Sequence, residues 1–88
     1  MSETPVAIVT AASKGIGAAC ARRLASDGFR VAIMSRSDGG QAIADEIGGI
    51  AIQGDMTRAD DIERLLDATL EKYGRLDAVA FNTGHLPT

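Results

Sequence analysis

With 88 residues, the chain is long enough for one small domain at most. It carries 9 basic and 12 acidic side chains, a net charge of −3. Phosphate backbones are held by clustered lysines and arginines, so no nucleic-acid partner is expected. The single cysteine, Cys20, excludes an internal disulfide and a multi-cysteine metal site.

No signal pattern opens the sequence, and no apolar run approaches the roughly 20 residues of a membrane span. We therefore expect a cytoplasmic protein without a membrane partner.

The first third of the sequence predicts a strand followed by a helix. The continuous apolar run Val6–Thr10 is typical of a strand buried on both faces. After Gly15 and Gly17 a helical pattern begins, and Gly28 stands where a C-cap glycine belongs. The expected apolar stripe of this helix consists of residues four apart: Ile16, Cys20 and Leu24.

Two further strand and helix pairs follow. A second strand is expected over 31–34, a weaker helix over 40–47 and a third strand over 50–52. Thr57 with Asp60 resembles a loose capping box and would open the strongest helix of the sequence. Its apolar positions are three and four apart: Ile62, Leu65, Leu66, Leu70 and Tyr73. Gly74 would end this helix before a fourth strand over 76–81.

This alternation predicts an α/β fold with a parallel sheet, because parallel strands need crossover helices, which are nearly always right-handed. A Rossmann-type dinucleotide fold has its first strand in the centre, so the expected strand order is 3-2-1-4. The pattern stops after the fourth strand, where such a fold continues. We interpret residues 1–88 as the amino-terminal part of a single dinucleotide-binding domain, truncated after that strand.

A glycine-containing loop joins the first predicted strand to the first predicted helix. A helix amino terminus offers unpaired N–H groups and a positive dipole end, and glycines let the backbone approach a pyrophosphate. The segment resembles the Thr-Gly-x-x-x-Gly-x-Gly loop of short-chain dehydrogenases/reductases, with Ala11 in place of the first glycine. The cofactor-binding residues implied here are Thr10, Ala11, Ser13, Lys14, Gly15, Ile16 and Gly17. The alternative is a tight turn without a ligand.

The residues after the second strand distinguish NADP(H) from NAD. Folds that bind NAD usually carry an acid there, which accepts hydrogen bonds from the ribose 2′-hydroxyl. Here the strand ends in Ser35 and Arg36, and both are predicted to bind the cofactor: an arginine pairs with a 2′-phosphate, and the serine hydroxyl offers a further donor. In the family, a basic residue here and one at Lys14 go with NADP(H), which we therefore expect as the cofactor in preference to NAD. Alternatively, Arg36 is a solvated surface residue, and a shifted register would make Asp38 the ribose acceptor.

Two further segments match the family. In short-chain dehydrogenases an aspartate after the third strand accepts a hydrogen bond from the adenine amino group, and the next N–H meets a ring nitrogen. Asp55 and Met56 match these positions, although Asp55 could simply stabilise a turn before Thr57. Residues 81–84 are similar to the family's Asn-Asn-Ala-Gly, whose main chain lies against the adenosine ribose. The site residues implied there are Asn82, Thr83 and Gly84.

The resemblance implies an oxidoreductase, homo-oligomeric as a whole protein, that transfers hydride between NADP(H) and a small ketone or alcohol such as a 3-oxoacyl thioester. The family's serine and Tyr-x-x-x-Lys pair lie beyond the fourth strand, so these 88 residues alone are expected to be inactive. Tyr73 is not that tyrosine, because Asp77 stands four positions later. No metal is expected. The alternative is a non-catalytic dinucleotide-binding or redox-sensing module.

Overall fold

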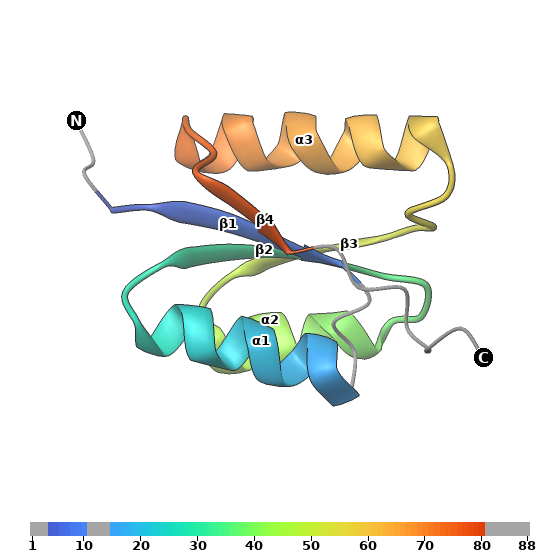
Figure 1. Cartoon of the computed structure of the whole chain (residues 1–88). Coiled ribbons are helices and arrows are strands. Elements are labelled where there is room, and N and C mark those ends of the chain that lie inside the picture. Colours follow the sequence, from blue (N-terminus) through green and yellow to red (C-terminus); the bar gives the residue numbers. More distant parts are fainter. Residues whose placement is uncertain (1–3, 11–14, 81–88) are drawn as a thin grey trace.

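The computed structural model describes residues 4–10 and 15–80, in which strands and helices alternate along the chain. The elements are β1 (Val6–Thr10), α1 (Gly15–Ser26), β2 (Arg30–Ser35), α2 (Gly39–Ile47), β3 (Ile50–Gln53), α3 (Ala59–Tyr73) and β4 (Ala78–Ala80). The strands form one parallel sheet in the order β3-β2-β1-β4. Helices α1 and α2 cover one face of this sheet, and α3 covers the other (Figure 1). The predicted Rossmann-type fold and strand order are confirmed.

The sheet separates two apolar clusters because side chains alternate along each strand. Toward α1 and α2 the cluster consists of Val9, Ala18, Ala21, Val31, Ile33, Ile43 and Ala44. Toward α3 it consists of Ile8, Ala32, Met34 and Leu65. Strand β1 is buried along its whole length, as is β2 after its first residue. The central strands therefore present apolar side chains to both layers, which explains their continuous apolar runs.

The predicted apolar stripe of α1 is wrong at its first position. Ile16 is 71 % exposed, whereas Gly17, Ala18 and Ala21 are buried against the sheet. Cys20 and Leu24 are partly buried and pack against this cluster. Small side chains let the helix lie close to the strands, so the packed face of α1 is centred on glycine and alanine rather than on its largest apolar residue.

The predicted end of α1 is confirmed. Gly28 has a φ of 98°, its N–H donates to the Ala25 carbonyl at 3.1 Å, and the Phe29 N–H donates to the Leu24 carbonyl at 3.0 Å. These two bonds define a Schellman motif, in which a glycine with positive φ satisfies carbonyl groups left unpaired at the helix end. The motif reverses the chain into β2.

The predicted capping box at the start of α3 is wrong. The helix begins at Ala59, after Arg58, and the Thr57 hydroxyl donates instead to Asp55 Oδ1 at 2.7 Å. The expected apolar stripe is also wider than the face that packs: Leu65 is 1 % exposed, but Leu66 and Leu70 are 36 % and 48 % exposed. Strand β4 begins at Ala78, two residues later than expected.

Candidate functional site

The carboxyl ends of β1, β2 and β3 meet at one edge of the sheet. Thr10 is level with Met34, and Ser35 is level with Gln53. The amino terminus of α1, at Gly15, follows β1 after residues that lie outside the described part of the chain. In open parallel sheets, ligands bind outside the carboxyl ends of the strands. This edge is therefore the candidate site.

The structure describes three residues of the glycine-loop motif: Thr10, Gly15 and Gly17. Thr10 is fully buried at the end of β1. Gly15 has a φ of 65°, and a Cβ placed on it would meet nothing within 4 Å. The requirement for glycine here is thus conformational, because other residues adopt this φ only with strain. Gly17 is buried in the first turn, whereas the Ile16 side chain points to solvent. Six predicted site residues lie outside the described residues: Ala11, Ser13, Lys14, Asn82, Thr83 and Gly84.

The end of β2 presents an exposed arginine. Ser35 is buried, and its hydroxyl donates to the Ser37 carbonyl at 2.6 Å. Arg36, the first residue after β2, is exposed, and its carbonyl accepts a hydrogen bond from Gln53 Nε2 at 3.2 Å. Within residues 4–10 and 15–80 its guanidinium makes no hydrogen bond or ion pair, so it can bind an anion. Asp38, the alternative ribose acceptor, lies further on, at the N-cap of α2.

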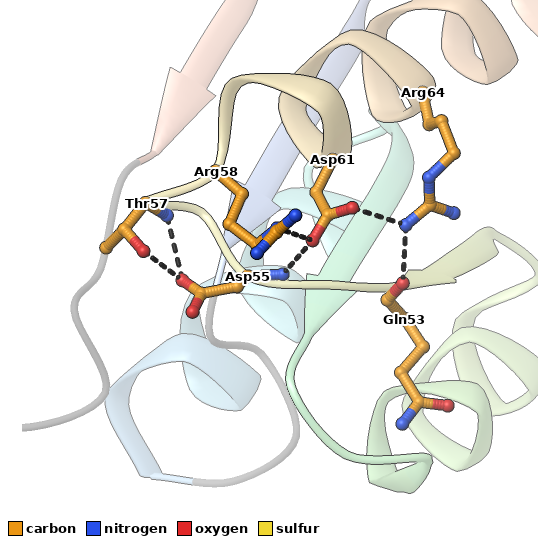
Figure 2. A network of polar contacts seen from close by, with 6 residues as sticks. All are labelled: Gln53, Asp55, Thr57, Arg58, Asp61 and Arg64. Atoms are coloured by element: carbon orange, nitrogen blue, oxygen red, sulfur yellow. Dashed lines mark hydrogen bonds and ion pairs between the residues drawn. The ribbon is translucent and has the colours of Figure 1, made fainter.

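Asp55 lies after β3 and shapes the loop that leads to α3. Its Oδ1 accepts hydrogen bonds from the Thr57 N–H at 2.8 Å and the Thr57 hydroxyl at 2.7 Å (Figure 2). These bonds, the hydroxyl first, lower the pKa of the Asp55 carboxyl, and the positive charge of Arg36 adds to the effect. Asp55 therefore does stabilise a turn before Thr57, as one reading of the sequence suggested. It is also close enough to Arg36 for their charges to interact.

The turn leaves Asp55 and Met56 with unused hydrogen-bonding groups. Asp55 Oδ2 accepts no hydrogen bond from the part of the chain that the structure describes, and the Met56 N–H donates none there. One carboxylate oxygen and one neighbouring N–H are the acceptor and donor that the edge of an adenine ring requires. The turn-stabilising role of Asp55 is therefore compatible with the adenine role implied by the resemblance.

A network of charged residues around this loop was missed in the sequence. Figure 2 shows Arg58, Asp61 and Arg64 along the start of α3, beside the loop that runs from Gln53 to Thr57, and Asp61 receives hydrogen bonds from Arg64 and from the Asp55 backbone. From the sequence, the acids at the start of α3 are explained by the helix dipole alone. The three-residue spacing of Asp61 and Arg64 was the available signal.

No helix in residues 4–10 and 15–80 is long and apolar enough to cross a membrane. No group of three or more His, Cys, Asp or Glu side chains in those same ranges is arranged to hold a metal ion.

Comparison with known proteins identifies the family. The family described as short chain dehydrogenase matches residues 5–88. The chain belongs to the short-chain dehydrogenase family. This confirms the resemblance drawn from Thr10, Gly15 and Gly17.

Several relatives of this short-chain dehydrogenase chain are oxidoreductases by name. It is 40 % identical over 85 residues to a granaticin polyketide synthase putative ketoacyl reductase 2 of Streptomyces violaceoruber, covering 93 % of this chain and 34 % of that protein. It is 40 % identical over 84 residues to an L-fucose dehydrogenase of Oryctolagus cuniculus, with 93 % and 30 % covered. An actinorhodin polyketide ketoreductase solved with NADPH superposes with a TM-score of 0.85 and 32 % identity, over 91 % of this chain and 33 % of that one. The chain thus spans about a third of the length of the proteins it matches.

Proposed function

We propose that the chain forms the NADP(H)-binding part of an oxidoreductase that transfers hydride between NADP(H) and a small ketone or alcohol. The observation that carries the proposal is Arg36, exposed directly after β2 at the carboxyl edge of the sheet. A cation at this position favours a ribose 2′-phosphate, whereas NAD-binding folds use an acid to accept from a 2′-hydroxyl. The actinorhodin ketoreductase solved with NADPH supports the same cofactor.

The residues at the sheet edge fit the adenosine and pyrophosphate half of the cofactor. The amino terminus of α1 at Gly15 would hold the pyrophosphate, and Arg36 would pair with the 2′-phosphate. Asp55 Oδ2 would accept from the adenine amino group beside the Met56 N–H. The bound cofactor supplies the hydride. The residues described here bind and orient it, and none of them is assigned a catalytic role.

The substrate proposal stays at the level of a carbonyl or alcohol group. The relatives include a ketoacyl reductase and a sugar dehydrogenase at the same 40 % identity. Sequence identity therefore does not favour one of these substrates over the other. A 3-oxoacyl thioester is one example of the carbonyl and alcohol substrates that we propose.

The cofactor assignment is tested with Arg36→Gln. Removing the guanidinium should lower the affinity for NADPH by roughly 10- to 150-fold and leave the affinity for NADH unchanged. This loss is equivalent to about 1.5–3 kcal/mol, the contribution of a charge-assisted hydrogen bond. Dissociation constants for both cofactors, measured by titration calorimetry on the full chain, give the answer. Arg23→Gln is the matched control, since Arg23 is an exposed arginine in the last turn of α1, away from the site. Equal losses of NADPH and NADH affinity would contradict the assignment.

A further inference from the structure

Asp61, in the first turn of α3, uses both carboxylate oxygens to hold the loop that contains Asp55. Its Oδ2 accepts the Asp55 N–H at 2.9 Å, and its Oδ1 accepts from the Arg64 guanidinium at 2.8 Å (Figure 2). The same Arg64 nitrogen donates to the Gln53 carbonyl at 3.1 Å. Asp61 and Arg64 therefore hold the backbone on both sides of Gly54.

Gly54 allows this close approach. A Cβ at Gly54 would lie 3.1 Å from both Cβ and Cγ of Asp61, so the loop backbone is in direct contact with that side chain. On the other side, the Gly54 N–H donates to the Ser35 carbonyl at 2.8 Å. The loop is thus fixed between the end of β2 and the first turn of α3. Its position depends on both elements.

Charge balance explains why an acid is tolerated so close to Asp55. Asp61 has an 18 % exposed side chain, and its charge opposes ionisation of Asp55. The hydrogen bond from Arg64, followed by that from the Asp55 N–H, lowers the pKa of Asp61, and the charge of Arg58 acts in the same direction. Arg58 Nε lies 3.9 Å from Asp61 Oδ2. The two arginines thus offset the repulsion between two carboxylates in one loop.

We propose that Asp61 and Arg64 are a pair of positioning residues that hold Asp55 against the adenine amino group and thereby set the selectivity of the protein for adenine. The proposal rests on the NADP(H)-binding function proposed above. Neither residue touches the cofactor in this scheme. Asp61 fixes the backbone of Asp55, Arg64 fixes that of Gln53, and Thr57 orients the Asp55 carboxylate from within the loop.

The test compares NADPH with its hypoxanthine analogue, in which a carbonyl oxygen replaces the adenine amino group. Asp55 can accept a hydrogen bond from the amino group but is repelled by the carbonyl oxygen. The wild-type chain should therefore bind NADPH roughly 10-fold more tightly than the analogue, or better. In Asp61→Asn, the ion pair with Arg64 is lost while the size of the side chain is kept. NADPH affinity should fall by roughly 3- to 10-fold, with little change for the analogue.

Two further variants make this measurement decisive. Asp60→Asn removes a neighbouring acid in the same helical turn that makes no hydrogen bond or ion pair with the described residues, so it should keep full discrimination. Arg64→Gln removes the other half of the pair and should repeat the loss if Asp61→Asn does not fold. Thermal unfolding followed by circular dichroism establishes that each variant is folded.

The possible outcomes separate the positioning role from the proposed function. Folded Asp61 and Arg64 variants that discriminate as the wild type does, or that lose both ligands equally, would overturn the positioning role. A wild-type chain that binds both ligands equally would show that Asp55 does not recognise the adenine amino group, and this too would overturn the positioning role. A wild-type chain that binds neither ligand would overturn the proposed function and this inference together.

Discussion

At the scale of single residues, Asp77 connects the start of β1 to the segment before β4. Its Oδ2 accepts the Val6 N–H at 2.8 Å across 71 positions of sequence, and its own N–H donates to the Val6 carbonyl at 2.8 Å. Arg75 donates to both carboxylate oxygens. The hydrogen bond from Arg75, and then that from Val6, lowers the pKa of the Asp77 carboxyl. The ionised form is therefore favoured by folding.

Asp77→Asn should destabilise the protein at neutral pH but not in acid. Because the folded pKa lies below the unfolded value of about 3.9, the carboxylate contributes stability above about pH 4 and loses it as pH falls through the folded pKa. The difference between variant and wild type in urea midpoint should thus shrink below about pH 4. Asp67→Asn is the control, an exposed acid on α3. A difference that does not change with pH would contradict this role for Asp77.

The positions of residues that follow apolar runs could be predicted from the sequence. The hydrogen bonds of side chains to backbone groups elsewhere in the chain could not. Gly15, Arg36 and Asp55 lie where expected, because each follows a strand that the sequence reveals as an apolar run. Their contacts with the cofactor stay predictions. Asp61 and Asp77 accept N–H groups from 6 and 71 positions away, and no side-chain pattern marks a backbone donor.

At the scale of elements, Gly49 sets the approach of the α2–β3 connection to β2. A Cβ at Gly49 would overlap the backbone carbonyl oxygen of Val31. Gly48, by contrast, has a φ of 73° and open space where a Cβ would lie. Gly49 is therefore required because there is no room for a side chain, and Gly48 is required because of its backbone conformation.

Gly49→Ala should cost more stability than Gly48→Ala. The second change strains the backbone by about 1–2 kcal/mol. Gly49→Ala forces the α2–β3 connection away from β2, because the backbone oxygen of Val31 cannot rotate out of the way. We expect its cost in stability to lie at the upper end of the roughly 1–3 kcal/mol typical of overpacking. Urea unfolding of both variants measures the difference. A Gly49→Ala protein as stable as Gly48→Ala would show that the connection yields easily.

The elements were predicted more accurately than their packed faces. The Gly28 cap followed from its residue type, and it was confirmed by the bonds to Ala25 and Leu24. The packed face of α1 was missed at Ile16 because close packing selects small side chains, while hydropathy points to large ones. At α3 the helix begins one residue later than the capping box required, with Arg58 at the N-cap, and the Thr57 hydroxyl donates to Asp55 in the preceding turn.

At the scale of the whole molecule, large apolar side chains remain exposed on α3 and β4. Among residues 4–10 and 15–80, Leu66, Leu70 and Val79 are 36 %, 48 % and 42 % exposed. In the sheet as described, β4 is an edge strand paired only with β1. Exposed apolar groups and an open strand edge both promote association.

Residues 1–88 produced by themselves should therefore self-associate as concentration rises. Changing Leu70 to Glu and Val79 to Lys together should shift the sample toward monomer, because charges on a helix face and an edge strand oppose pairing. Sedimentation velocity at several concentrations measures the change. Ala42→Glu, at an exposed position of α2, is the control. A monomeric wild-type sample at all concentrations would contradict this expectation.

The central place of β1 also fixes an order of events during synthesis. β1 leaves the ribosome first, and β2 can pair with it once residues 30–35 follow. Its other edge must wait for residues 78–80 and for the bond between Val6 and Asp77. Contacts that close long loops form late because of their entropic cost. Each newly made chain thus passes through an interval in which β1, buried in the finished sheet, has one unpaired edge.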